Sequence, residues 1–411
     1  MTNKLQSKTK SWKDAFRTVI NLGYHFPEAL FWTLYYRFPA RKLTVIGVTG
    51  TDGKTTTSNL IWHILTSAGK KTGLVTSINA KIGSQEEDTG FHVTTPNSKK
   101  LQRFLSKMIR GGVKYAIIEA TSHGLDQYRL WGANFSLGVI TNITPEHLDY
   151  HKNMSNYAKA KAKLFATTKI AVLNQDDDWF SYLKSTLPKQ NKIITYGIKS
   201  KADITPKSFP HRCPLPGLYN QYNCLAAIAA ACALGIGDQK IKAALNSFSS
   251  PKGRLDPIDL GQNFSVFVDF AHTPNALKNV LTELRQRLAR GKKLIAVFGC
   301  AGLRDQQKRP VMGQIASQLA DLTIITSEDP RTENPDRIAK NIAAGCLPKT
   351  KKKIITNRAK AINFAICQAQ KGDIVVLLGK GHEQSMCFGK TEYPWSDHEA
   401  AQEALKKLLK R

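Results

Sequence analysis

Short apolar, β-branched runs alternate along this chain with segments in which apolar residues recur every three or four positions. The first series has β-type runs at 43–48, 74–76, 115–118, 137–141, 170–173 and 193–196, with helix-type segments at 99–109 and 155–166. The second has β-type runs at 265–268, 294–298, 322–326 and 374–378, with helix-type segments at 276–290, 311–318, 336–344, 359–370 and 399–409. Such alternation predicts mostly parallel sheets with helices on both faces.

The segment between the two series indicates where one domain ends. Residues 197–217 are polar and proline-bearing, helix-type segments follow at 222–234 and 240–248, and Ser249–Arg254 has the composition of a linker. We therefore predict an α/β protein with two doubly wound domains in series, a central one at 42–253 and a C-terminal one at 254–411, after a short segment at 1–41. Ligands of such sheets bind outside the carboxyl ends of the strands, and we expect a two-substrate site in a cleft between the domains.

The chain is strongly basic, with 60 Lys and Arg against 31 Asp and Glu and a formal net charge of +29. This charge favours anionic partners, such as phosphorylated substrates, nucleic acid or acidic lipid headgroups. The basic residues are spread along the sequence, with a small cluster at 349–353, and no long basic arm contains interleaved aromatic residues. We therefore expect no nucleic-acid partner.

Two further features bear on location. The seven cysteines are odd in number and never spaced as CxxC, which is typical of reduced residues in a cytoplasmic protein. No secretory signal and no apolar run long enough to span a bilayer is visible. Residues 12–41 are rich in aromatic side chains and bounded by basic ones, so they either pack on the following domain or the substrate, which we favour, or lie at a membrane interface.

The stretch GTDGKTT after the first β-type run predicts a nucleoside triphosphate site. Glycines let backbone amides approach phosphate oxygens, Lys54 can reach the outer phosphates, and the Thr55 hydroxyl can ligate Mg²⁺. The common phosphate loop has a glycine where this chain has Val48, so the match is to a shorter form of the motif. The alternative is a glycine-rich turn that only joins a strand to a helix.

Polar residues that follow other β-type runs are candidates for the metal site. Glu119 ends one run, His147 follows another, and Lys161 lies on the helix-type segment after it. Glu119 is a hard oxygen ligand suited to Mg²⁺ and His147 offers a nitrogen. Taken singly, a histidine at a strand end and a lysine among other helix lysines are more typical of structural and solvated residues.

Together, the motifs resemble those of the Mur ligases, the ATP-dependent amide-forming enzymes of peptidoglycan assembly, and among them the UDP-N-acetylmuramoyl-dipeptide ligases. The resemblance runs from residue 42 to the C-terminus. It rests on the following motifs: GTDGKTT (50–56), TTP (94–96), EATSHGLDQYR (119–129), NITPEHLDYH (142–151), YAKAKAKLF (157–165), LPGLYNQYN (215–223), GRLD (253–256), DFAHTPNAL (269–277), FGCAGLRDQQKRP (298–310), SEDPRTE (327–333) and GKGHE (379–383).

The resemblance implies a P-loop ATPase-like central domain, a Rossmann-like C-terminal domain and roles for matching positions. The implied catalytic residues are Lys54, Glu119, His147 and Lys161. The implied Mg²⁺ ligands are Thr55, Glu119, His147 and Lys161, the last as a carbamate. The implied nucleotide-binding residues are Gly50, Thr51, Asp52, Gly53, Lys54, Thr55, Thr56, Asn220, Asn223, Arg254, Asp269 and His272. The implied substrate-binding residues are Thr94, Thr95, Ser122, Gln127, Arg129, Arg309, Asp329, Arg331, Gly379 and Glu383.

Three positions depart from the family pattern. Residues 1–41 stand where the family has a larger domain for the uridine end of its substrate, so the acceptor is UDP-linked or lipid-linked. The DNPR motif of diaminopimelate-adding members reads EDPR here; Arg331 can still pair bidentately with a carboxylate, but Asp329 in place of Asn changes the donor pattern. Glu146 replaces a frequent Asp, a minor change.

The resemblance implies an ATP- and Mg²⁺-dependent ligase that joins diaminopimelate or lysine to UDP-N-acetylmuramoyl-L-Ala-D-Glu through an acyl phosphate. We also expect a cytoplasmic monomer, and membrane association is an alternative that we do not favour. Within the superfamily the alternatives are folylpolyglutamate synthetase and cyanophycin-type ligases. Outside it, the alternatives are a non-catalytic nucleotide-binding protein and a basic protein that binds nucleic acid or membrane.

Overall fold

A computed structural model describes residues 18–83, 85–87, 89 and 95–410 of the chain. The chain forms two compact units, each described here by itself. The first unit comprises Met1–Ile143, Asn153–Pro214 and Tyr222–Phe248, and the second comprises Thr144–Lys152, Leu215–Gln221 and Ser249–Arg411. The short segments 144–152 and 215–221 thus group with the second unit, although they lie within the predicted central domain.

The first unit is built on an eight-stranded sheet with the order β4-β3-β2-β5-β1-β6-β7-β8. Its strands are β1 (Thr44–Thr49), β2 (Thr72–Val75), β3 (Ala80–Ile82), β4 (Gln85–Glu87), β5 (Tyr115–Glu119), β6 (Leu137–Ile140), β7 (Ile170–Asn174) and β8 (Lys192–Tyr196). All neighbours pair in parallel except β2 with β3 and β3 with β4. Because β5 and β6 flank β1 on opposite sides, the carboxyl end of β1 is a topological switch point, where such sheets bind ligands.

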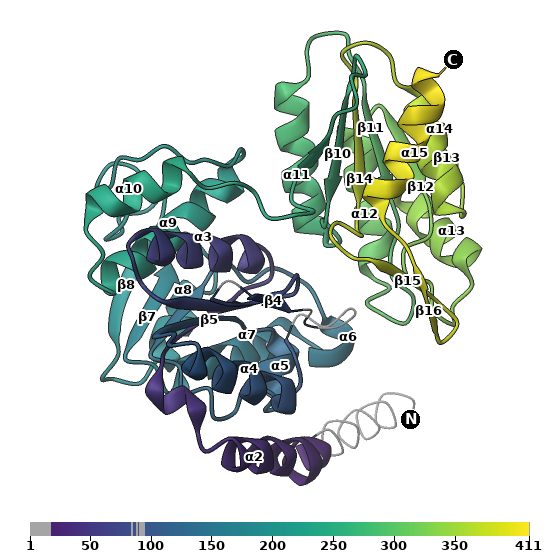
Figure 1. The fold of residues 1–411 in the computed structure, drawn as a ribbon. Coiled ribbons are helices and arrows are strands. Elements are labelled where there is room, and N and C mark those ends of the chain that lie inside the picture. The colour runs from purple at the N-terminus through teal and green to yellow at the C-terminus, as the bar shows by residue number, and fades with distance from the viewer. Residues whose placement is uncertain (1–17, 84, 88, 90–94, 411) are drawn as a thin grey trace. The chain divides into compact units, whose positions relative to one another are not determined.

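Helices cover both faces of this sheet, as predicted (Figure 1). One face packs on α3 (Lys54–Ser67), α9 (Leu218–Ala233) and α10 (Asp238–Asn246). The other packs on α4 (Ser98–Arg110), α5 (Ser122–Asp126), α7 (Met154–Ala162) and α8 (Phe180–Thr186). Successive residues of β1 point to opposite faces: Val45 packs in the core with α4, and Ile46 packs in the core with α3. Burial on both faces explains why β1 reads as a continuous apolar run.

The second unit has a six-stranded sheet with the order β13-β12-β11-β14-β10-β9 and a hairpin of β15 and β16. These strands are β9 (Asp256–Ile258), β10 (Ser265–Asp269), β11 (Leu294–Phe298), β12 (Leu322–Ile325), β13 (Lys351–Ile354), β14 (Ile374–Leu378), β15 (Ser385–Phe388) and β16 (Thr391–Pro394). One core holds residues of α11 (Pro274–Arg287), α12 (Lys308–Leu319) and α13 (Pro335–Gly345), and the other those of α14 (Arg358–Gln368) and α15 (Asp397–Leu409). The short helix α6 (Leu148–His151) also belongs to this unit.

The lysine cluster near residue 350 forms an edge strand that the sequence pattern did not predict. β13 pairs in parallel with β12 and with no other strand among the described residues, and all four of its residues, KKKI, are exposed.

One side of the described part of the aromatic N-terminal segment packs on the first unit, in agreement with the favoured interpretation, and this contact leaves a membrane role untested. The segment forms a π-helical turn (Asn21–His25), α2 (Phe26–Tyr35) and a 3₁₀ turn (Pro39–Lys42). The Phe26 ring makes edge contacts with the rings of Tyr128 and Trp131, and α2 contacts α4. Within the described residues no helix is long and apolar enough to cross a membrane. All seven cysteines are described, and none is in a disulfide.

Candidate functional site

The phosphate loop lies at the carboxyl end of β1, and its two glycines are required by close contacts. Gly50 has a φ of 148° and Gly53, the N-cap of α3, a φ of 81°. A Cβ at Gly50 would clash with the Thr141 hydroxyl, and one at Gly53 would clash with the amide of Asn223. The end of β6 also fixes the loop, since the Thr141 hydroxyl donates to the Asp52 carbonyl at 2.6 Å. The loop is therefore held in shape by its neighbours.

Two lysines point at this loop. Lys54 Nζ donates to the Thr51 carbonyl at 2.7 Å and to the Gly50 carbonyl at 3.1 Å. Lys161, from α7, is almost completely buried, and its Nζ donates to the same Gly50 carbonyl at 2.6 Å. The Lys161 ammonium also lies 4.4 Å from the centroid of the Tyr157 ring. The structure thus brings Lys54 and Lys161, which are far apart in sequence, to the same loop.

A cluster of hard oxygen atoms adjoins the first turn of α3. The Thr55 hydroxyl donates to Glu119 Oε2 at 3.0 Å, and the Ser77 amide donates to the same oxygen at 3.2 Å. Glu119 is buried at the end of β5. A hydroxyl and a carboxylate beside a phosphate loop suit Mg²⁺, which prefers oxygen ligands and usually also binds substrate phosphates. Ser77 has no sequence signal that links it to this cluster.

His147 groups with the second unit, whereas Thr55 and Glu119 belong to the first, and each unit is described by itself. The role of His147 as a metal ligand therefore stays a prediction. This histidine is the N-cap of α6 and has a left-handed backbone, with φ 57° and ψ 29°. This conformation is uncommon for a residue other than glycine, and such outliers concentrate at functional sites. Among the described residues no group of three or more His, Cys, Asp and Glu side chains is arranged to hold a metal ion.

The predicted acceptor-binding residues gather around the carboxyl end of β5 and α5. The Thr95 hydroxyl lies 3.2 Å from the Glu119 carbonyl oxygen and 2.8 Å from the Thr121 hydroxyl, and Ser122 is buried at the start of α5. Arg129 follows α5, and Gln127 Oε1 is buried without a hydrogen-bond partner among the described residues. An unpaired buried amide oxygen is costly, so it is a ready contact for a bound molecule. Thr94 lies outside the described residues.

The two predicted nucleotide-binding asparagines lie at the start of α9. Asn223 is buried, and its Oδ1 accepts a hydrogen bond from the Thr57 hydroxyl at 3.3 Å, beside the phosphate loop. Asn220 groups with the second unit, and its Nδ2 donates to the Pro216 carbonyl at 2.6 Å. Thr56, in the first turn of α3, is buried.

In the second unit, Asp269 at the end of β10 joins the residues that follow the linker to the residues that follow β10. Its carboxylate accepts hydrogen bonds from the Leu255 and Ala271 amides, both at 2.7 Å. The guanidinium carbon of Arg254 lies 4.8 Å from the centroid of the Phe270 ring. The His272 ring also contacts Phe270, with ring centroids 4.7 Å apart and an interplanar angle of 57°. The three predicted nucleotide contacts of this unit therefore form one local cluster.

Asp329 and Glu383, two of the implied substrate-binding residues, both pair with Lys380, a buried lysine to which the resemblance gave no role. Its Nζ lies 2.9 Å from Asp329 Oδ1 and 2.5 Å from Glu383 Oε2. Burial opposes the charged form, but the two carboxylates outweigh it and raise the pKa of Lys380. Asp329 Oδ1 also accepts from the Cys387 amide at 3.0 Å. Arg331, with a left-handed φ of 52°, donates from Nη1 to the Gly302 carbonyl at 3.1 Å.

Arg309 has a structural partner. Its side chain is 0% exposed, and its two terminal nitrogens donate to the Glu333 oxygens at 2.6 and 2.8 Å. This bidentate pair holds the pKa of Glu333 below its usual value. Arg304, five positions earlier in the same motif, is solvent-accessible, and partial burial and the like charge of Arg331 lower its pKa. Arg304 is thus exposed, whereas the guanidinium of Arg309 is occupied by Glu333.

Glu328 is a buried carboxyl group that the sequence analysis did not assign. Burial raises its pKa to about 7, and Oε2 has no hydrogen-bond partner among the described residues. Gly379, with φ 105°, lies against it, because a Cβ there would come within 3.0 Å of Glu328 Oε2. Nearby, Lys308 and Glu146 form a buried ion pair at 3.0 Å.

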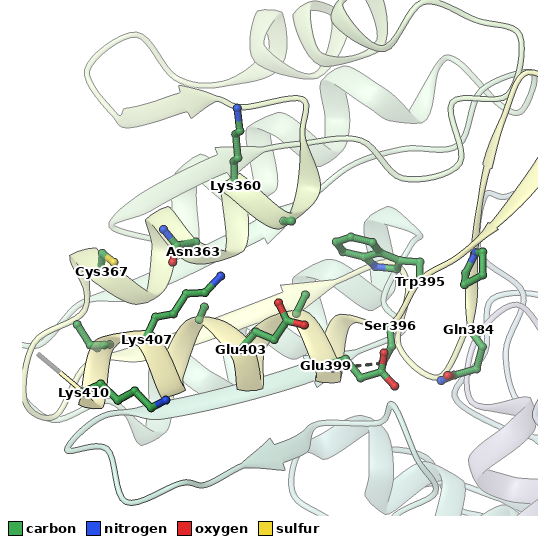
Figure 2. Close-up of a pocket in the computed structure, with 15 residues that line it drawn as sticks. Lys360, Asn363, Cys367, Gln384, Trp395, Ser396, Glu399, Glu403, Lys407 and Lys410 are labelled. Carbon is green, nitrogen blue, oxygen red and sulfur yellow. Dashed lines mark hydrogen bonds between the residues drawn. The ribbon is translucent and has the colours of Figure 1, made fainter.

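A groove of the second unit lies elsewhere. It has a volume of about 940 Å³ and runs between α14 and α15. Figure 2 shows Glu403 and Lys407 of α15 pointing toward α14, whereas Lys360 of α14 points away from α15. None of the predicted site residues lines it.

Comparison with known proteins places these motifs in a family. Residues 48–231 match the Mur ligase middle domain, and residues 253–381 match the Mur ligase, glutamate ligase domain. The UDP-N-acetylmuramoyl-L-alanyl-D-glutamate--2,6-diaminopimelate ligase of Geobacillus kaustophilus is 39% identical over 400 residues, covering 90% of this chain and 81% of the relative. The enzyme of the same name from Gloeobacter violaceus is 40% identical over 399 residues, covering 92% and 80%.

Solved structures agree. A UDP-N-acetylmuramoyl-L-alanyl-D-glutamate--2,6-diaminopimelate ligase is 34% identical with a TM-score of 0.60, covering 89% of this chain and 79% of its own. Mycobacterium tuberculosis folylpolyglutamate synthase has a TM-score of 0.69 and covers 94% of this chain and 95% of its own, but at 16% identity it shares the fold alone. The ordered motifs, the phosphate loop and the close relatives lead to one conclusion: the chain belongs to the Mur ligase family.

Proposed function

We propose that this protein is an ATP-dependent ligase that adds diaminopimelate to UDP-N-acetylmuramoyl-L-alanyl-D-glutamate during peptidoglycan precursor synthesis in the cytoplasm. The observation that carries the proposal is the phosphate loop with Lys54 and Lys161 on one carbonyl and Thr55 bonded to Glu119. The relatives named for this reaction are about 39% identical over most of the chain.

The first step transfers the ATP γ-phosphoryl group to the acceptor carboxylate. A carboxylate oxygen attacks phosphorus, the bond to ADP breaks, and an acyl phosphate forms. Catalysis of this step depends on positioning and on stabilising charge on the phosphoryl oxygens. Lys54 supplies positive charge at the loop, and loop amides cradle the phosphates. Gln127 and Arg129 orient the acceptor.

Magnesium fits the donor set at the loop. Thr55 and Glu119 are the residues that would hold it, with His147 and a carbamylated Lys161 as further ligands. When bound, the ion neutralises the triphosphate charge and orients its oxygens. Carbamylation would turn Lys161 from a cation into an anion with two oxygen ligands, which reverses its effect on a nearby metal.

The second step forms the amide. The amine of the incoming amino acid attacks the acyl carbonyl, and the tetrahedral intermediate expels phosphate. His272 and Glu383 are candidates to receive the amine proton, and neither acts as a covalent nucleophile. Exclusion of water protects the acyl phosphate from hydrolysis.

Selection of the amino acid falls to the second unit. Arg331 is the candidate to bind the distal carboxylate of diaminopimelate, because a guanidinium binds a carboxylate bidentately, and the exposed Arg304 is a second candidate. Lysine has the same distal amine but lacks that carboxylate. Asp329 stands where diaminopimelate-adding members have Asn, and its carboxylate accepts a hydrogen bond from Lys380. The charge of Lys380 therefore compensates the negative charge that Asp329 adds.

The test is ATP-dependent phosphate release combined with mass spectrometry of the products. The full-length protein is supplied with UDP-N-acetylmuramoyl-L-Ala-D-Glu and with meso-diaminopimelate or lysine, and Lys54→Ala is the inactive control. We expect a product heavier by one diaminopimelate residue and little or no lysine product.

Other outcomes would redirect the proposal. Lysine addition at an equal rate would contradict the role of the Arg331 region. Phosphate release only with a lipid-linked muramyl peptide would change the acceptor while keeping the chemistry. Release only with folate or an acidic peptide acceptor would support another branch of the superfamily, and no release with any acceptor would contradict ligase activity.

A further inference from the structure

The helix α2 is apolar on all sides. Its sequence, FPEALFWTLY, contains one charged residue, Glu28. Ala29 and Thr33 lie on the side that packs against the first unit. A helix that is apolar all round is normally buried on all sides, in a protein core or in a lipid environment. One side of α2 is not covered by the residues that the structure describes.

The uncovered side carries large aromatic and aliphatic side chains, here called the aromatic strip, with the half-buried Glu28 between Tyr24 and Phe31. Its large members are Tyr24 (64% exposed), Phe31 (57%), Leu34 (52%) and Tyr35 (65%). Phe31 and Tyr35 are one turn apart and stack, with ring centroids 6.3 Å apart and an interplanar angle of 27°. Figure 1 shows α2 on the outer side of the first unit, beyond α4 and α5. Contiguous exposed apolar surface of this kind marks a binding surface.

Basic side chains flank the strip. Lys99 Nζ of α4 lies 4.6 Å from the Trp32 ring centroid, and the Arg41 guanidinium carbon lies 4.1 Å from that of Phe38. Arg37, at the end of α2, is exposed. The aromatic rings thus stand among cations, on a chain whose net charge is +29.

We propose that the aromatic strip lies in the headgroup region of an anionic lipid bilayer, with the flanking basic residues on lipid phosphates. Aromatic rings with polar edges favour the membrane interface, and Lys and Arg reach headgroups while their stems cover apolar surface. A surface that binds a second copy of this chain would bring its own basic flank against another, which is unfavourable. The helix lies on the membrane, because it is too short to span one.

This inference goes beyond the proposed function and does not depend on it. It has a consequence for the site, because α2 is joined to the segment that follows β5. Asn21 Nδ2 donates to the Asp126 carbonyl at 3.2 Å, and Phe26 contacts Tyr128. The membrane contact would therefore be fixed directly to the region proposed to hold the acceptor.

The experiment is sedimentation of the full-length protein with sucrose-loaded vesicles, without substrates. Vesicles of phosphatidylcholine alone are compared with vesicles that also contain phosphatidylglycerol, at low and high salt. The test variant combines Phe31→Ser and Tyr35→Ser. The matched control combines Phe388→Ser and Tyr393→Ser, an exposed Phe and Tyr pair on the second unit with ring centroids 6.2 Å apart. Thermal unfolding and size-exclusion chromatography accompany each variant.

We expect binding to the anionic vesicles that weakens at high salt and falls about tenfold or more in the Phe31 and Tyr35 variant, because two interfacial rings are lost. The control variant should bind like the unaltered protein. A third variant, Arg37→Gln with Arg41→Gln, tests the basic flank without altering the strip and should also bind less. Absence of vesicle binding, equal binding by the Phe31 and Tyr35 variant, or a dimer that this variant dissociates would each overturn the proposal.

Discussion

Lys54 and Lys161 donate to the same carbonyl oxygen, that of Gly50, at 3.1 and 2.6 Å. Two ammonium groups on one acceptor repel each other, and Lys161 is buried, so water screens the repulsion poorly. Converting one of them to an anion would replace repulsion by attraction. Lys161 is the better candidate because Lys54 is needed as a cation at the phosphates.

Replacing Lys161 by Ala should therefore abolish phosphate release, and small carboxylates such as formate should restore part of it by supplying the missing anion. Lys159→Ala is the matched control, since Lys159 lies on the same helix but is exposed. Phosphate release is measured for both, with the mass of the intact protein as a check for added CO₂. Full activity of the Lys161 variant would show that this lysine has no role in catalysis.

The bond between Thr55 and Glu119 predicts a shared role in holding Mg²⁺. Thr55→Val keeps the shape and removes the hydroxyl, and Glu119→Gln keeps the shape and removes the charge. Each should raise the Mg²⁺ concentration needed for half-maximal phosphate release by about tenfold or more. Ser77→Ala removes a hydroxyl beside the same carboxylate and should have a smaller effect. An unchanged Mg²⁺ requirement in both principal variants would remove them from the metal site.

Variants of Arg309 and Arg304 should have different effects: the first should lower stability, and the second should weaken substrate binding. Arg309→Met leaves Glu333 without its bidentate partner, and breaking a buried pair typically costs about 3–5 kcal/mol of unfolding free energy. Arg304→Met should leave stability nearly unchanged and raise the KM for diaminopimelate. Urea unfolding and steady-state kinetics check the two variants side by side. A stable Arg309 variant with a raised KM would restore the assignment made from sequence.

Glu328 should make stability depend on pH. Its pKa is raised from 4.5 to about 7, so the folded protein binds this proton more tightly than the unfolded chain does. The group's stabilising contribution is present below the unfolded pKa and is lost as the pH rises through the folded one, by about 3 kcal/mol in all. Glu328→Gln should flatten the free energy of unfolding between about pH 4.5 and 7. An identical pH profile in the variant would mean that burial does not perturb this carboxyl group.

The regular elements were predictable because each is specified locally. Apolar runs such as that at 137–141 gave the buried strands, and the helix-type segment at 99–109 became α4 with one extra residue at each end. The missed elements lack that signal. β13 is three lysines and an isoleucine, and it is a strand because β12 offers it an edge.

The site was predictable only where one motif carries it. GTDGKTT identified Lys54 and Thr55, but Ser77 reaches Glu119 and Lys308 reaches Glu146 through contacts that periodicity does not encode. Arg309 and Arg304 lie in one motif and differ only in what the fold places beside them. The partner that buries and neutralises Arg309 is Glu333, which lies in another motif, so the motif of the two arginines alone could not show which of them is paired.

The exposed strand β13 affects how the molecule behaves at high concentration. An unpaired strand edge can pair with the edge of another copy and start aggregation. Here Lys351, Lys352 and Lys353 follow one another along that edge on alternating faces, so two copies approaching edge to edge would bring like charges together on both faces. The repulsion between these lysines therefore opposes pairing of the sheet edge with a second copy. At this edge the basic residues of the chain limit aggregation, whether or not a ligand is bound.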